Sequence, residues 1–199
     1  MKTIIAGVLC LFAAQVWGQC SPIVVDLNRN GVHLGPEGRG VNFDVNADGF
    51  ADFVQWVRPR GDEAFLALDR NRNGVVDDGS ELFGVGTPLF EGGNAPNGFV
   101  GLAQYDAPLL GGNDDGLISP EDAIWPELSI WLDRNADGVS IAHEMYRPAE
   151  LGLRSFETIP KARRQRDAAG NSLPYWAKAI IRNKETDMVD VYFQVLTPT

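Results

Sequence analysis

Four segments of this sequence repeat the pattern Asp-x-Asn-x-(Asn/Asp)-Gly. They occupy residues 26–31, 44–49, 69–74 and 133–138. When the backbone of such a segment curls, the side-chain oxygens of alternate residues converge on one point, and the glycine in sixth place permits the sharp turn. Oxygen donors in this arrangement are the ligands that calcium prefers. The repeats therefore predict several calcium sites.

The segment at Asp133 is the most complete of the four. After its glycine the spacing continues to Glu144, which falls at the twelfth position, where an EF-hand loop carries a bidentate glutamate. The expected ligands are Asp133, Asn135, Asp137, the carbonyl oxygen of Val139, and Glu144.

The segment at Asp69 has Ser80 at its twelfth position, and acidic residues stand at the ninth and thirteenth positions instead. Either acid can complete the site. The expected ligands are Asp69, Asn71, Asn73, the carbonyl oxygen of Val75, and Asp77 or Glu81.

The segment at Asp44 has no glutamate within reach, so its site would borrow an acid from another loop. Its expected ligands are Asp44, Asn46, Asp48 and Asp52.

The segment at Asp26 offers Asn28 and Asn30 beside a single carboxylate. Since calcium affinity follows ligand charge, this segment is the weakest candidate. An Asx-rich turn between strands explains it equally well.

A fifth, interrupted copy is indicated by Asp106, Asn113, Asp115 and Asp122, with residues 107–112 inserted after the first ligand. The insertion can bulge outward without moving the other ligands. For all five segments the alternative is ordinary turn chemistry, because Asn, Asp and Gly are the commonest turn residues.

No catalytic group is predicted. His33 and His143 are the only histidines, and their spacing implies no pairing with a serine or cysteine nucleophile. The basic run at residues 161–166 is interpreted as a solvated hairpin tip.

Residues 1–18 are typical of a secretory signal peptide, with Lys2 followed by an apolar run and small or branched residues near position 18. The mature chain would then be secreted or periplasmic, and it has no transmembrane segment. Cys20 would be its only thiol, so no disulfide framework is expected. A lipid anchor at Cys20 is the alternative, although Gln19 occupies the preceding position, where a small residue is required.

The formal charge of −10 argues against nucleic acid and anionic lipid as partners. Calcium in the acidic loops accounts for this charge. The length suits one domain over residues 19–199, with a calcium-loop core at 22–155 and a β-hairpin tail at 156–199.

The expected fold class is α+β, with short strands and short helices organised around EF-like loops. Strands are predicted at residues 23–25, 41–43, 53–57, 64–68 and 128–132, and a hairpin at 175–181 and 188–195. Helices are predicted over 98–105 and from Ser119 onward.

The order of segments resembles the calcium-dependent self-processing module of RTX (haemolysin-type) secreted proteins. The resemblance spans about residues 22–155 and is most specific over residues 69–84. It implies a calcium-folded module in which an Asp-Pro bond at the start is cut. Here Ser21 precedes Pro22, and no Asp-Pro dipeptide occurs in the chain, so no cleavage is expected.

The leading hypothesis is a secreted calcium-binding module, structural or adhesive in role. The alternative is a calcium-dependent autoprocessing or other hydrolytic module that is catalytically impaired. A third interpretation is a module that binds a cell-surface protein or glycan through aromatic residues such as Trp56 or Trp176, although core packing explains both.

Overall fold

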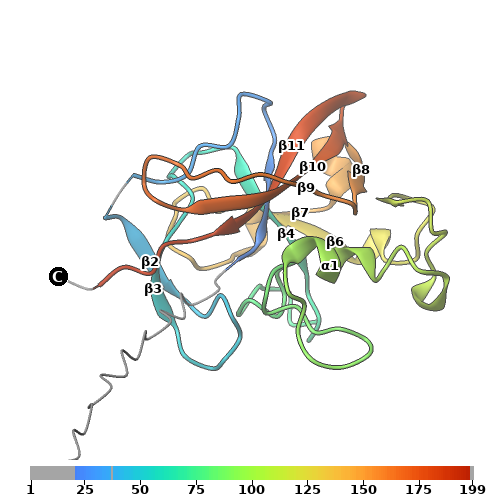
Figure 1. The fold of residues 1–199 in the computed structure, drawn as a ribbon, viewed down its shortest axis with the longest axis horizontal. Helices are drawn as coiled ribbons and strands as arrows, with labels where there is room; N and C mark the ends of the chain where they lie inside the picture. Colours follow the sequence, from blue (N-terminus) through green and yellow to red (C-terminus); the bar gives the residue numbers. More distant parts are fainter. Residues whose placement is uncertain (1–20, 37, 198–199) are drawn as a thin grey trace, which may run out of the picture.

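The computed structural model describes residues 21–36 and 38–197. The predicted signal peptide and Cys20 lie outside this part of the chain. Its main feature is a curled nine-stranded sheet in which every pairing is antiparallel (Figure 1). The strands are β1 (Ile23–Asp26), β4 (Glu63–Leu68), β5 (Leu117–Ile118), β6 (Leu128–Trp131), β7 (Met145–Tyr146), β8 (Leu153–Glu157), β9 (Lys161–Ala162), β10 (Ser172–Ile181) and β11 (Lys184–Tyr192).

The strand order is β5-β8-β10-β11-β1-β4-β6-β7, and β9 also pairs with β10. The long β10–β11 hairpin belongs to the sheet, and β11 pairs directly with β1 (Figure 1). The C-terminal hairpin therefore joins the first strand of the described chain at the centre of the sheet. A separate hairpin is formed by β2 (Gly40–Phe43) and β3 (Asp52–Gln55).

The central strands are buried on both faces of the sheet. In β4, Ala64, Leu66 and Leu68 belong to one apolar core, whereas Phe65 and Ala67 belong to a second. The same alternation occurs in β1, β6, β10 and β11, because successive side chains of a strand point to opposite faces. α1 (Gly98–Ala103) contributes to the first core, and the β2–β3 hairpin covers the second.

The predicted α+β class is wrong. Within the described residues the only α-helix is α1, which has six residues. The other helical segments are 3-10 turns: η1 (Pro108–Leu110), η2 (Trp125–Glu127), η3 (Ala142–Glu144) and η4 (Pro148–Leu151). The protein is mostly antiparallel β.

The helix predicted from Ser119 does not form. The Asp122 side chain turns back and accepts the Ser119 N–H at 2.7 Å, which closes a local turn. Pro126 has no N–H to continue an α-helix, and only the short 3-10 turn η2 forms around it. The capping and charge pattern of this segment therefore belongs to a loop.

None of the helices in the described ranges has the length and apolar character needed to cross a lipid bilayer.

Candidate metal centre

The five candidate segments share one backbone conformation. In each, the fourth residue has a left-handed φ, a conformation that costs a residue other than glycine about 1 kcal/mol. These residues are Arg29 (φ 66°), Ala47 (57°), Arg72 (62°), Asp114 (59°) and Ala136 (55°). The sixth residue is a glycine with a positive φ in every case: Gly31, Gly49, Gly74, Gly116 and Gly138. The interrupted copy at Asp106 is thus a full member of the set.

The five loops also share their internal hydrogen bonds. The Oδ2 atom of the first aspartate accepts the N–H of the glycine at 2.7 Å for Asp26, 2.8 Å for Asp44 and Asp69, and 2.9 Å for Asp106 and Asp133. The Oδ1 atom of the third residue accepts the N–H of the fifth in every loop. These bonds curl each backbone so that the oxygens of alternate residues face inward.

In the Asp133 loop the twelfth residue contacts the first turn of the loop. Glu144 is 2% exposed, and its Oε1 accepts the Arg134 N–H at 3.0 Å. Its Oε2 is buried and has no hydrogen-bond partner. A buried carboxylate oxygen without a partner is costly, and a cation in the loop would supply one.

The Asp106 loop shows the same feature. When residues 107–111 are left out of the count, so that Gly112 is the second residue of the loop, Asp122 falls at the twelfth position, and it too is 2% exposed. One of its oxygens accepts the Ser119 N–H, and the other, Oδ1, is buried without a partner. Burial raises the pKa of this carboxyl, and the charges of Asp106 and Asp115 raise it further. The insertion contains η1, and the residues that follow it keep the backbone conformation of the other loops.

Asp77 and Glu81, the two acids predicted as alternative ligands, both contact the Asp69 loop. Glu81 is 2% exposed, and its Oε1 accepts the Arg70 N–H at 3.0 Å, the same role that Glu144 has in the Asp133 loop. The Asp77 carboxylate accepts the side-chain amides of Asn71 at 2.8 Å and Asn73 at 2.6 Å. The structure therefore brings both Asp77 and Glu81 to the loop.

The Asp44 loop is tied to a neighbouring loop by a backbone hydrogen bond. The Asn46 amide donates to Asp48 at 3.0 Å, and the Asp44 carbonyl accepts the Gly79 N–H at 2.7 Å. The second bond ties this loop to the Asp69 loop. Ser140 ties the Asp133 loop to the same region, because its hydroxyl accepts the Val76 N–H at 2.6 Å. Three loops are thus joined into one cluster.

The Asp26 loop has acidic neighbours that the sequence analysis missed. Strand pairing puts Asp26 opposite Glu63, and the Leu27 N–H donates to the Asp62 carbonyl at 3.1 Å. Burial raises the pKa of the Asp62 carboxyl, and contact with Asp26 raises it further. Glu63 is 1% exposed and accepts the His33 N–H at 2.6 Å. Two carboxylates in contact are a better cation site than the single one counted from sequence.

Among the described residues, no three His, Cys, Asp or Glu side chains gather into one metal-binding group. The loops instead combine carboxylates with Asn side chains and backbone carbonyls, which are calcium donors rather than ligands of softer metals. Neither histidine stands at a first, third or fifth loop position.

A buried polar cluster lies outside the loops, where the described chain begins. Ser21 is 1% exposed, and its buried hydroxyl has no hydrogen-bond partner among the described residues. Asp190 is fully buried, accepts the Gly98 N–H at 3.0 Å, and has one unpartnered oxygen. Burial raises the pKa of Asp190 to about 7. Sequence reasoning missed this acid because it stands inside an otherwise ordinary strand.

The chain has recognisable relatives. It is 34% identical over 154 residues to the iron-regulated protein FrpA of Neisseria meningitidis serogroup C, an alignment that covers 76% of this chain and 13% of FrpA. The family model described as the SPM domain matches residues 23–194, which include every candidate loop and the whole nine-stranded sheet. The chain therefore belongs to the SPM domain family.

Proposed function

We propose that this chain is a secreted calcium-binding module, structural or adhesive in role, that folds on binding calcium. One observation carries the proposal. Five loops with the same curl each turn a first aspartate inward, and in two of them the twelfth residue, Glu144 or Asp122, is a buried carboxylate with an unpartnered oxygen.

The physical reason is that the ligand-free loops are unfavourable. Each holds a non-glycine residue in the left-handed region, and the better sites crowd several carboxylates together. A divalent cation neutralises the carboxylates and supplies the missing partner, so its binding free energy becomes folding free energy. Extracellular calcium at about 10⁻⁴ to 10⁻³ M is enough for modules of this type. The chain would stay loose before export and fold outside the cell.

The similarity to FrpA is consistent with a module of a larger protein. The alignment with this chain covers 13% of the length of FrpA. The partner of the folded module would be a cell-surface protein or glycan.

Calcium titration by calorimetry on the protein without residues 1–18 tests the proposal, and near-UV circular dichroism follows folding in parallel. We expect binding heat and a tryptophan signal that collapses in excess chelator. Magnesium is the control, because it retains its waters and suits such flexible loops poorly. Absence of calcium heat, together with an unchanged spectrum and melting temperature in chelator, would overturn the proposal.

A further inference from the structure

A cleft of about 340 Å³ opens between the Asp26 loop, the Asp133 loop and the turn that joins β10 to β11. Its lining includes Leu132 and Ile181, which are only 4% and 2% exposed and give it an apolar floor. This volume is near the lower end of the range for small-ligand clefts.

Three arginines line the same cleft: Arg29, Arg134 and Arg182. They come from three different segments, and all three are exposed. None of their guanidinium groups forms an ion pair or hydrogen bond with another of the described residues. Three unpaired cations around one cleft are unexpected in a chain with a formal charge of −10.

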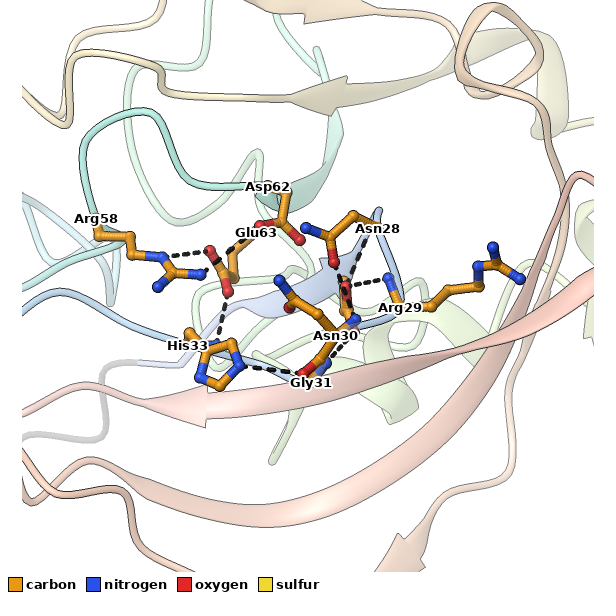
Figure 2. A network of polar contacts seen from close by, with 9 residues as sticks. Asn28, Arg29, Asn30, Gly31, His33, Arg58, Asp62 and Glu63 are labelled. Atoms are coloured by element: carbon orange, nitrogen blue, oxygen red, sulfur yellow. Dashed lines mark hydrogen bonds and ion pairs between the residues drawn. The ribbon is translucent and has the colours of Figure 1, made fainter.

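Two of these arginines stand where the backbone favours other residues. Arg29 has φ 66° and Arg182 has φ 49°, both in the left-handed region that suits glycine or asparagine. Arginine therefore brings a cost at both positions, and the fold gains no internal contact from the charge. In Figure 2 the Arg29 side chain extends away from Asp62 and Glu63.

The cleft has one acidic rim residue. Asp62 also lines it, but its carboxylate lies 3.7 Å from the Arg58 guanidinium and is in contact with Asp26. Calcium in the Asp26 loop would neutralise this pair of carboxylates and leave the three arginines as the dominant charge.

We propose that this cleft binds a small organic anion, whose carboxylate, sulfate or phosphate group is held by Arg29, Arg134 and Arg182 while its body rests on Leu132 and Ile181. Guanidinium groups match such oxyanions in both charge and geometry, because their N–H donors form paired bonds. The calcium dependence of the site rests on the proposed function, since it requires an ion in the Asp26 and Asp133 loops. An acidic sugar of a surface glycan has the required chemistry.

The test is calorimetric titration of the calcium-loaded protein with glucuronate, glucose 6-sulfate, uncharged glucose and inorganic sulfate. We expect the two charged sugars to bind at least tenfold more tightly than glucose and more tightly than sulfate alone. Equal binding of glucose and the charged sugars, or no binding of any probe, would overturn the proposal. Binding of sulfate as tight as that of the sugars would remove the role of the apolar floor.

Variants distinguish binding in the cleft from a general effect of lost positive charge. Arg29→Asn keeps a residue that tolerates the left-handed backbone, and it should weaken binding of the charged sugars by about tenfold, the loss expected for one charge-assisted contact. Arg72→Asn is the matched control, because Arg72 holds the same position and φ (62°) in the Asp69 loop but lies outside the cleft. Arg182→Asn should behave as Arg29→Asn does. Equal effects of Arg29→Asn and Arg72→Asn would contradict the assignment.

Calcium heat is recorded for every variant. If calcium binds normally and no charged sugar does, the cleft proposal fails and the proposed function stands. If the sugars bind and calcium produces no heat, the proposed function fails and the cleft stands.

Discussion

The indole Nε1–H of Trp56 donates to Oδ2 of Asp133 at 2.7 Å, and both residues are at most 2% exposed. Trp56 also packs against Phe43, Phe65, Trp131 and Phe193, with ring centroids 4.6 to 5.8 Å apart. Asp133, the first residue of the most complete loop and a proposed calcium ligand, is therefore hydrogen-bonded directly to the aromatic core of the protein.

Trp56→Phe should weaken both the fold and the response to calcium. The substitution keeps an aromatic ring but removes one donor from a buried carboxylate, a loss of about 1–3 kcal/mol in the free energy of unfolding. We expect the calcium concentration at half-folding to rise, as measured by near-UV circular dichroism. Trp176→Phe is the control, because the Trp176 indole donates to the Leu173 carbonyl at 2.8 Å, away from the loops. Trp176→Phe should lower stability without a specific change in calcium response. If both variants shifted the calcium concentration at half-folding equally, Trp56 would have no special role at the Asp133 loop.

Glu144→Gln should raise the calcium concentration at half-folding by on the order of tenfold or more. Glutamine keeps the volume of the side chain but removes the charge that offsets the dehydration of the ion. Asp69→Asn should come close behind. Asp26→Asn should have the smallest effect of the three, because Asp62 remains beside that loop. If Asp26→Asn proved the most damaging, the first loop would hold the dominant ion.

Asp122→Asn tests whether the interrupted loop binds metal. The variant should lower the number of calcium ions measured by calorimetry, because it removes the charge of the carboxylate proposed as the twelfth ligand of that loop. Glu127→Gln makes the same charge change at an exposed residue of η2 and should leave the stoichiometry unaltered. Unchanged calcium heat in Asp122→Asn would reduce the Asp106 loop to a turn.

Asp190 should make stability depend on pH in the direction opposite to a paired carboxylate. Burial raises its pKa from 3.8 to about 7, so the folded protein binds a proton that the unfolded chain releases between those values. The contribution of Asp190 to the free energy of unfolding is therefore fully present below about pH 4, falls as pH rises to about 7, and stays low above that, a change of up to about 4 kcal/mol.

Asp190→Asn keeps an acceptor for the Gly98 N–H and removes the titration. Urea unfolding in saturating calcium at pH 5 and pH 8 measures the effect. The original protein should lose more stability between these two pH values than the variant does. Because Asp62, Glu63 and Asp122 titrate in both proteins, the difference isolates Asp190, and parallel pH profiles would contradict its assignment.

Local patterns identified the loops, and long-range pairing decided the rest. The loop from Asp133 to Glu144 could be found from residue spacing, since its candidate ligands all lie within one short stretch of sequence. The short strands around residues 23–25, 64–68 and 128–132 also form, because β-branched and aromatic runs are local signals.

Asp62 and Asp190 could not be placed in this way. The first reaches the Asp26 loop through the register of β1 against β4, and the second is buried because β11 is central rather than peripheral. The fold class failed for a related reason. The residues from Ser119 to Asp122 are common both at the start of a helix and in turns. Only Pro126, which lacks an N–H, indicates that an α-helix would not continue.

The 3-10 turn at Pro108–Leu110 separates Asp106 from Asn113 and Asp115 of the same loop, and Leu109 in this turn is 73% exposed. The Gly112 N–H donates to the Ala107 carbonyl at 3.1 Å, so the two ends of the inserted segment are pinned together. The residues between those ends can therefore change without moving Asn113 and Asp115. This stretch is therefore a natural graft point, where an epitope or reporter peptide can be displayed while the surrounding scaffold keeps its shape.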